Sequence, residues 1–283
     1  MLNLKLLLRL KVSAKNAAFG NTQNVSRHFM ITKCKLCETN KSSKIKSHYV
    51  SKFLRKDIFE NGISALVKND LSKTNINDLP KDQFIFCDEC EDKFELIETI
   101  SSKILQNIEE KNNFKKLYFE YYENENHIIE LSRNILEFNL FILSLIWRMS
   151  ISSHSVFEKF KIPLVKENSI KQLLNNALKN KKSDYNDDSC LKFDFKYVII
   201  KPENRNENTR SHLSAFSSTP NIHMAFLVNF YICIYFDDSI IPFALRKYCN
   251  ESSNSLKIIL GDDEKWKMLN NIALNKFLNK NVG

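Results

Sequence analysis

Two cysteine pairs are the residues of this chain with the most specific chemistry. Cys34 and Cys37 leave a two-residue gap, Cys87 and Cys90 leave the same gap, and 49 residues separate the two pairs. Such a gap lets both thiolates of a pair reach one ion from a tight turn, and zinc binds four sulfurs tetrahedrally at about 2.3 Å. We therefore predict a structural Zn²⁺ site at these cysteines, with redox pairs as the alternative. A closed four-cysteine site has no open coordination position, so this zinc would not be catalytic.

The other cysteines argue against a disulfide framework. The chain has 283 residues and seven cysteines, of which Cys190, Cys233 and Cys249 have no close neighbour in sequence. Disulfide-stapled proteins are typically smaller and denser in cysteine. We interpret the pattern as a metal site plus buried thiols in a reducing compartment, and expect a cytoplasmic protein.

A histidine and two carboxylates lie close to the cysteine pairs in sequence. Ser47-His48 begins ten residues after Cys37 and continues as Tyr-Val-Ser-Lys-Phe-Leu. Glu91 directly follows the last cysteine of the second pair, and Glu95 comes one helical turn later. Further along, residues 144–148 read Ser-x-x-Trp-Arg. Together these motifs resemble the HNH (ββα-metal) endonuclease family, and more closely a group of uncharacterised bacterial HNH-like proteins.

The resemblance covers residues 34–98, and residues 128–150 more loosely. It implies phosphodiester hydrolysis, with His48 as the general base that activates water. It also implies one Mg²⁺ or Mn²⁺ ion, held by residues of the helix after the second pair. The family usually has histidine at the position of Glu91 and an acid at the position of Ser47. Because a carboxylate also binds Mg²⁺, the carboxylates that would replace the histidine are Glu91, Glu95 or Glu98.

Plainer interpretations of the same residues stay open. His48 would then be a hydrogen-bonded residue that packs the first cysteine pair against the helix. Glu91 would be a charge partner of the helix N-terminus. The family's asparagine, which orients the base, has Asn75 and Asn77 as its nearest counterparts here. A non-catalytic zinc-scaffolded module that binds nucleic acid or a protein partner is therefore the alternative function.

The charge of the chain is concentrated near the first cysteine pair. Residues 1–60 carry 13 Lys/Arg and 3 Asp/Glu, a net charge of +10, whereas residues 61–283 carry 29 and 30, a net charge of −1. A basic surface of this kind suits a polyanion, and we expect nucleic acid as the partner. A solvated surface with a disordered tail is the alternative. The predicted contacts are Lys44, Lys46, Lys52, Arg55 and Lys56.

The elements that would position the zinc site follow from local patterns. Apolar spacing predicts an amphipathic helix over residues 45–60, followed by a polar loop over residues 61–82. A short β run at residues 84–86 would deliver the second pair, and a helix would extend from Asp88 to about Glu110. One cysteine pair on a hairpin together with a second cysteine pair at the start of a helix is typical of a treble-clef zinc module.

Beyond this module the periodicity changes from helical to alternating. Residues 114–180 predict helices, with an apolar, buried one over residues 131–148. Residues 179–190 form a polar linker. Alternating apolar residues then predict strands over 193–199, a long strand or a bent pair of strands over 222–236, further strands at 240–245 and 256–260, and a closing helix at 265–278. Residues 204–221 predict a polar loop.

We therefore predict an α+β protein with an N-terminal four-cysteine zinc treble-clef module, a central helical segment and a C-terminal antiparallel β-rich region. The chain is long enough for a sizeable core, and its four glycines and five prolines argue against linker-rich classes. The expected divisions are a basic leader at residues 1–29, the zinc module at 30–112, the helical segment at 113–182 and the β-rich domain at 190–283.

The leader has two interpretations. It contains no acid and many leucines, which is compatible with an organellar transit peptide, and translation from Met30 is equally compatible. We predict no membrane span, because no run reaches the roughly 18–20 apolar residues that one requires.

Overall fold

The computed structural model divides into the units Met1–Met30 and Ile31–Gly283. It describes residues 32–54, 64–67, 73–76, 78–109, 119–121, 128–131, 133–185, 191–202, 212–228, 230–252, 254–262, 264, 266–269 and 271, all in the second unit. The predicted leader, residues 1–29, lies outside the described residues, as does most of the predicted closing helix.

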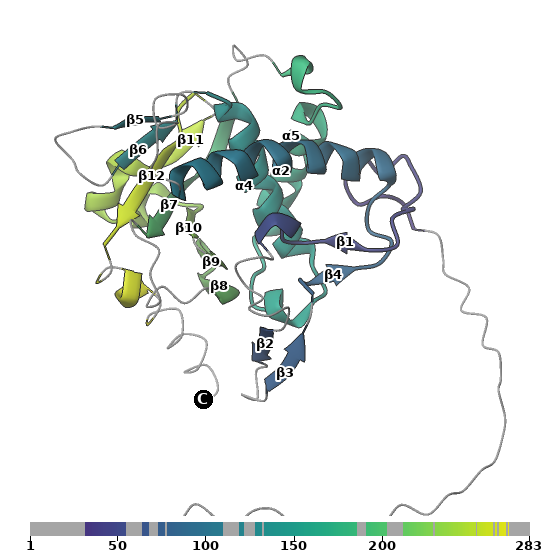
Figure 1. The fold of residues 1–283 in the computed structure, drawn as a ribbon, viewed down its shortest axis with the longest axis horizontal. Coiled ribbons are helices and arrows are strands. Elements are labelled where there is room, and N and C mark those ends of the chain that lie inside the picture. The colour runs from purple at the N-terminus through teal and green to yellow at the C-terminus, as the bar shows by residue number, and fades with distance from the viewer. Residues whose placement is uncertain are drawn as a thin grey trace, which may run out of the picture. The chain divides into compact units, whose positions relative to one another are not determined.

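The described strands of the C-terminal part form an eight-stranded sheet (Figure 1). Its order is β5 (Phe119–Tyr121), β6 (Ile128–Leu131), β12 (Lys257–Gly261), β7 (Lys192–Pro202), β10 (Phe230–Tyr235), β9 (Ile222–Val228) and β8 (His212–Thr219), with β11 (Asn250–Ser252) also paired to β7. The β-rich C-terminal region is thus confirmed.

The sheet is mixed rather than antiparallel as predicted. β12 lies between β6 and β7, and it pairs antiparallel to β6 but parallel to β7. Ile258 is opposite Ile129 on one side and Ile199 on the other. A strand from the predicted central segment is thereby joined to the C-terminal sheet by β12, the last strand among the described residues.

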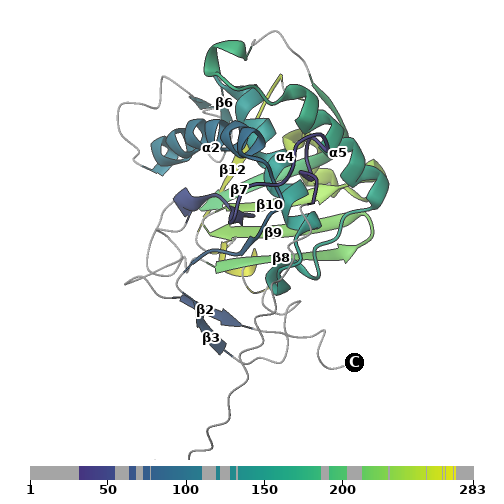
Figure 2. The same ribbon diagram turned by 90° about the vertical axis from the view of Figure 1, so that its right-hand side faces the viewer.

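Three helices stand beside this sheet. α2 (Asp88–Glu109) packs on α4 (Ile135–Ile151), and α4 packs on α5 (Leu164–Ala177). Figure 2 shows α4 and α5 on the same side of the sheet. Every residue of α4 from Leu136 to Ser150 is buried, which confirms the prediction of a helix that is apolar nearly all round.

One hydrophobic core connects the cysteine segment, the helices and the sheet. It contains Leu36 from the turn of the first cysteine pair, Phe94 from α2, Phe141 from α4 and Ile232 from β10. A polar contact adds to it, because the Tyr197 hydroxyl of β7 donates to the Asn139 side chain of α4. The predicted division after residue 182 stays a prediction from composition.

A hairpin reverses the faces of the alternating segment 222–236. We predicted one long strand or a bent pair of strands, and a pair is found: β9 and β10 pair antiparallel, with Phe230 opposite Leu227. Ile232 and Ile234 of β10 therefore share the α4 side with the odd-numbered Leu227 of β9. The even-numbered Phe226 packs instead on the other face, against Trp266. The turn changes the parity, since side chains alternate along each strand.

The segment between the cysteine pairs is β structure rather than helix and loop. Where a helix was predicted at residues 45–60, the described part forms β1 (Ser47–His48) and a 3₁₀ turn, η1 (Lys52–Leu54). Where a loop was predicted, β2 (Ser64–Val67) pairs with β3 (Lys73–Ile76), and β4 (Lys81–Asp82) pairs with β1. Pairing between distant strands outweighs local apolar spacing here, and Tyr49, Val50 and Leu54 are buried all the same.

Other local predictions were also wrong. Residues 84–86 form no strand, and Phe84 has a positive φ of 55°. β5 and β6 lie in the segment predicted as helical, and β8 lies in a predicted loop. The predicted strand at 240–245 is replaced by the 3₁₀ turns η4 (Asp238–Ile240) and η5 (Phe243–Tyr248). Two more 3₁₀ turns are η2 (Ser155–Phe157) and η3 (Lys182–Asp184). In the part of the chain that is described, no helix combines the length and apolarity needed to traverse a bilayer.

A buried histidine of β9, His223, lies opposite Ser217 of the neighbouring strand β8. His223 is fully buried, its Nε2 lies 3.0 Å from the Pro220 carbonyl oxygen, and its Nδ1 lies 2.7 Å from Ser217 Oγ. Since a carbonyl only accepts, Nε2 carries the proton and Nδ1 accepts from the serine. Burial lowers the pKa of His223, although the bond to Pro220 opposes this.

The lowered pKa of His223 predicts a loss of stability in acid. The folded-state pKa lies below the ordinary value of 6.5, so the stabilisation is present above pH 6.5 and is lost as the pH falls below it. One proton contributes at most about 1.4 kcal/mol per pH unit. We expect the free energy of urea unfolding to fall more steeply between pH 7 and 5 for the wild type than for His223→Gln. Parallel curves would contradict this assignment.

Candidate metal centre and the His48 site

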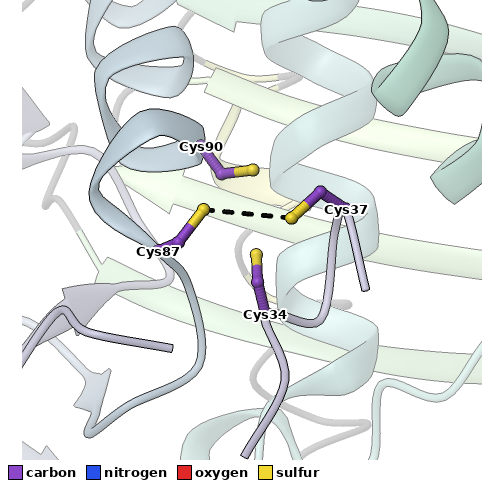
Figure 3. Close-up of side chains that lie close together, drawn as sticks. All are labelled: Cys34, Cys37, Cys87 and Cys90. Carbon is purple, nitrogen blue, oxygen red and sulfur yellow. Dashed lines mark hydrogen bonds between the residues drawn. The ribbon is translucent and has the colours of Figure 1, made fainter. Parts of the chain in front are cut away.

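The four cysteines predicted as metal ligands converge on one point (Figure 3). Their sulfur atoms all lie within 4.8 Å of one another, and Cys37 Sγ is 3.9 Å from Cys87 Sγ. In a tetrahedral site with zinc–sulfur bonds of about 2.3 Å, neighbouring sulfurs are roughly 3.8 Å apart. The cluster could therefore hold a metal ion, and its sulfur spacing fits a tetrahedral thiolate site. Cys34, Cys87 and Cys90 are buried, and Cys37 is half-buried.

Backbone hydrogen bonds shape the turn that carries the first pair. The Cys34 N–H donates to the Asn40 carbonyl at 2.8 Å, and the Glu38 N–H donates to the Cys34 carbonyl at 3.0 Å. Glu38 has a positive φ of 56°, which lets the chain reverse tightly after Cys37. The Lys35 N–H donates to the Ile85 carbonyl at 2.9 Å. This last bond fastens the first turn to the residues just before the second pair.

The second pair sits at the N-terminus of α2. Cys87 precedes the helix and Cys90 lies in its first turn. Ser43 Oγ donates to the Asp88 carboxylate at 2.8 Å, and the Asn40 side-chain amide lies 3.8 Å from Cys87 Sγ as a donor. The helix N-terminus also favours negative charge on nearby sulfur. The predicted helix start at Asp88 is confirmed.

Crowding of the thiols favours a cation at this place. The hydrogen bond from Cys90 lowers the pKa of Cys34 to about 4, against the opposing effect of burial. The same contact raises the pKa of Cys90, since it holds the proton that Cys34 accepts. Without a cation, deprotonation of Cys34 thus hinders Cys90 from losing its proton. A divalent ion would remove this penalty, because its charge offsets the charge of several thiolates.

His48 lies on a short two-stranded antiparallel sheet, β1 with β4, beside α2. It ends β1 and is opposite Lys81 of β4. Its ring is half-buried, and Nδ1 is enclosed without a hydrogen-bond partner among the described residues. Burial lowers the pKa of His48, and Lys52 and Lys81 reinforce the change. Asp78 and Glu98 oppose it. The ring is therefore neutral near pH 7.

Glu91 faces the same strand. Burial raises the pKa of Glu91, whereas the neighbouring Ser47 hydroxyl and the charge of Arg148 lower it. Glu91 Oε1 and Ser47 Oγ are both enclosed, and neither reaches hydrogen-bond geometry with any residue the structure describes. The first turn of α2 thus presents an enclosed carboxylate oxygen near β1.

Glu98, rather than the predicted Glu95, acts on His48. Glu95 is exposed on α2, whereas Glu98 is half-buried and influences the His48 ring. Seven residues are nearly two full helical turns, so Glu98 lies on the same face of α2 as Glu91. Its carboxylate forms a 2.7 Å ion pair with Arg148 of α4. Glu95 and Glu98 follow Glu91 by four and seven residues, so the helical repeat alone does not separate them.

The predicted nucleic-acid contacts fall into three groups. Lys46 and Lys52 are exposed on either side of Ser47-His48, and Lys44 is half-buried. Arg55 and Lys56 lie outside the described residues. Of the predicted basic residues, Lys52 is the one whose charge contributes to lowering the pKa of His48.

Sequence reasoning overlooked Asp78 and Lys81. They form an ion pair with each other, and both influence His48 electrostatically. The structure brings them to His48 because β4 pairs with β1. Asn75, considered as an orienting residue, belongs to β3, and Asn77 lies outside the described residues. The signal that could have revealed Asp78 was the pairing partner of Ser47-His48, which no local pattern predicts.

Comparisons with models of protein families, with curated proteins and with solved structures found no match.

Loss of one sulfur should remove the metal. In Cys37→Ser we expect bound zinc to fall far below the approximately one ion per chain of the wild type. The melting temperature should fall as well, because metal affinity contributes to folding stability. Cys249→Ser is the matched control, as Cys249 is half-buried but outside the cluster. Elemental analysis and thermal melts with and without chelator measure both effects. Equal zinc in the two variants would refute the site.

Proposed function

We propose that this protein is a zinc-scaffolded, HNH-like protein that contacts nucleic acid, with His48 as the general base of metal-dependent phosphodiester cleavage. One observation carries the proposal. His48 stands on the antiparallel pair of strands β1 and β4 next to α2, whose start carries half of the four-cysteine cluster. Two antiparallel strands and a helix around a cysteine cluster agree with the ββα arrangement of that family and with a treble-clef module, and the metal in this proposal is Zn²⁺.

The state of His48 suits a general base. A base must be unprotonated near the working pH and within reach of the water that it activates. Burial lowers the pKa of His48, so the neutral ring predominates at pH 7. The ring is half-buried rather than fully enclosed. It would take the proton from water as the oxygen attacks phosphorus.

A catalytic cation would complete the chemistry. Glu91 offers an enclosed carboxylate oxygen without a partner among the described residues, and oxygen is the ligand type that Mg²⁺ and Mn²⁺ prefer. When bound, such an ion supplies positive charge for the leaving oxygen. Glu91 is the residue we expect to hold it, and Asp78 is a further acid whose charge acts on His48.

The partner follows from charge. Lys46 and Lys52 are exposed and flank His48 in sequence, and residues 1–60 carry a net charge of +10. A phosphate backbone approaching His48 would meet these ammonium groups. Nucleic acid is therefore the substrate class that suits both the histidine and its surroundings.

A second function is favoured by the carboxylates. The Glu98 carboxylate is paired with Arg148, and burial raises the pKa of Glu91. Both effects weaken the case for these groups as anionic metal ligands. The alternative is a zinc-scaffolded module that binds nucleic acid or a protein without cleaving it.

Binding is tested by removing the two exposed lysines. The double variant Lys46→Ala/Lys52→Ala should weaken binding to duplex DNA or RNA, and the dependence of log K on log salt should decrease by up to about 2. Lys179→Ala/Lys182→Ala is the matched control, as both lysines are exposed in the polar linker. Fluorescence anisotropy at several salt concentrations measures both quantities. Identical slopes for the two double variants would contradict binding at this surface.

Cleavage is tested at His48. With plasmid or RNA and Mg²⁺ or Mn²⁺, His48→Ala should lower the rate about 100-fold or more at unchanged zinc content. His154→Ala is the control, because His154 is also half-buried with a pKa lowered by burial. If the wild type cleaves nothing with either ion but binds with salt sensitivity, the non-catalytic alternative holds. Equal rates for wild type and His48→Ala would exclude His48 as the base.

A further inference from the structure

Arg148 joins three elements of the structure that are distant in sequence. Its Nη1 donates to the His48 carbonyl of β1 at 3.1 Å, and its Nη2 lies 2.7 Å from Glu98 Oε1 of α2. Within α4, its Nε donates to the Ser144 carbonyl at 3.3 Å, and Nη2 lies 3.4 Å from Ser144 Oγ. We propose that Arg148 is the positioning residue of His48, an inference that rests on the function proposed above.

Burial of this arginine indicates a specific use. Only 2% of the Arg148 side chain is exposed, and the guanidinium lies 4.9 Å from the centre of the Phe94 ring. Removing a charge from water is costly, and an apolar residue would fill a core position equally well. The guanidinium instead uses its planar set of donors to hold a carbonyl, a carboxylate and a helix at once. Because it is enclosed, Arg148 acts through His48 rather than on a substrate.

His48 has few other restraints. β1 is two residues long and pairs with β4 through Ser47 and His48. The Nδ1 atom of the ring has no hydrogen-bond partner among the described residues, so no described bond to that atom orients the ring. The direction of the side chain therefore depends on the backbone of β1. The bond from Arg148 holds that backbone at the residue that carries the ring.

The inference gives a role to the Ser-x-x-Trp-Arg sequence of α4. Ser144 accepts a hydrogen bond from Arg148 within α4. Trp147 packs on Phe86, which directly precedes Cys87, with 5.8 Å between the ring centres. Ser144 and Arg148 are one turn apart, so both lie on the α4 face that meets α2 and β1. Trp147 and Arg148, which the sequence suggests as the end of a helix, thus contact the segment between and after the cysteine pairs at Phe86, His48 and Glu98.

Histidine NMR on the full chain tests the proposal. The variants are Arg148→Lys, which keeps the charge but not the fork, Arg148→Met, and Glu98→Gln, which leaves the bond to the His48 carbonyl possible. Arg246→Met is the control, because Arg246 also donates to a carbonyl, that of Ile241, in the C-terminal part. Signals of His48 are assigned by their loss in His48→Ala, zinc is measured for every variant, and His154 and His223 serve as internal references.

We expect both Arg148 variants to keep their zinc and to shift the His48 ring signals. The His48 titration midpoint should move up toward 6.5, because a loosened strand exposes the ring to water. Arg148→Lys should show the same change, which separates geometry from charge, whereas Glu98→Gln should not move the midpoint up, because the Glu98 charge itself raises the pKa of His48. In cleavage assays kcat should fall about 10- to 100-fold with KM nearly unchanged.

Two outcomes would overturn the proposal. One is unchanged His48 signals and midpoint in both Arg148 variants at full zinc content. The other is loss of zinc and of all dispersed signals in both, which would make Arg148 a general element of stability. If the wild type cleaves no substrate while His48 shifts as expected, the cleavage function fails but the hold of Arg148 on His48 stands.

Discussion

The convergence of four cysteine thiols on one point is the constraint on which the N-terminal part of this structure depends. Sulfur atoms within 4.8 Å of one another cannot all carry negative charge unless a cation lies among them. Their convergence brings a turn at residues 34–40 against the start of α2, although 49 residues separate the two pairs in sequence. Strand β1, which carries His48, and its partner β4 both lie between the two cysteine pairs in sequence, so the cluster restrains where the histidine can lie.

The cysteine segment is not attached to the remainder by a linker alone. α2 packs on the buried helix α4, and α4 in turn contacts the sheet, for example through Asn139 and Tyr197. Apolar residues from Leu36 to Ile258 belong to the same hydrophobic core. Arg148 adds a polar connection at the same interface. If His48 acts on a phosphodiester, its position is therefore set by α4 as much as by the metal cluster. The β-rich region then stabilises the helix that supports the site.

Features with a strong local signal were predictable. The cysteine spacing, the start of α2 at Asp88 and the all-round apolar α4 depend on neighbours in sequence, and each was confirmed. Residues 45–60 misled because apolar spacing there matches a helix, whereas β1 forms by pairing with Lys81 and Asp82. For segment 222–236 a pair of strands was among the predictions, but the exchange of faces between them was not. The reversal from β9 to β10 keeps the alternation in sequence but exchanges the two faces of the sheet.

The amino-acid sequence by itself determined which groups are available: four thiols in metal-binding spacing, one histidine between them, and a basic N-terminal fifth. Tertiary structure alone decided their neighbours. It placed Asp78 and Glu98 near His48 and left Glu95 in solvent. It also placed Arg148 on a carbonyl 100 residues away in sequence. The physical reason is that coordination spacing and helical periodicity are local properties, whereas strand pairing and buried ion pairs join residues whose separation in sequence carries no signal.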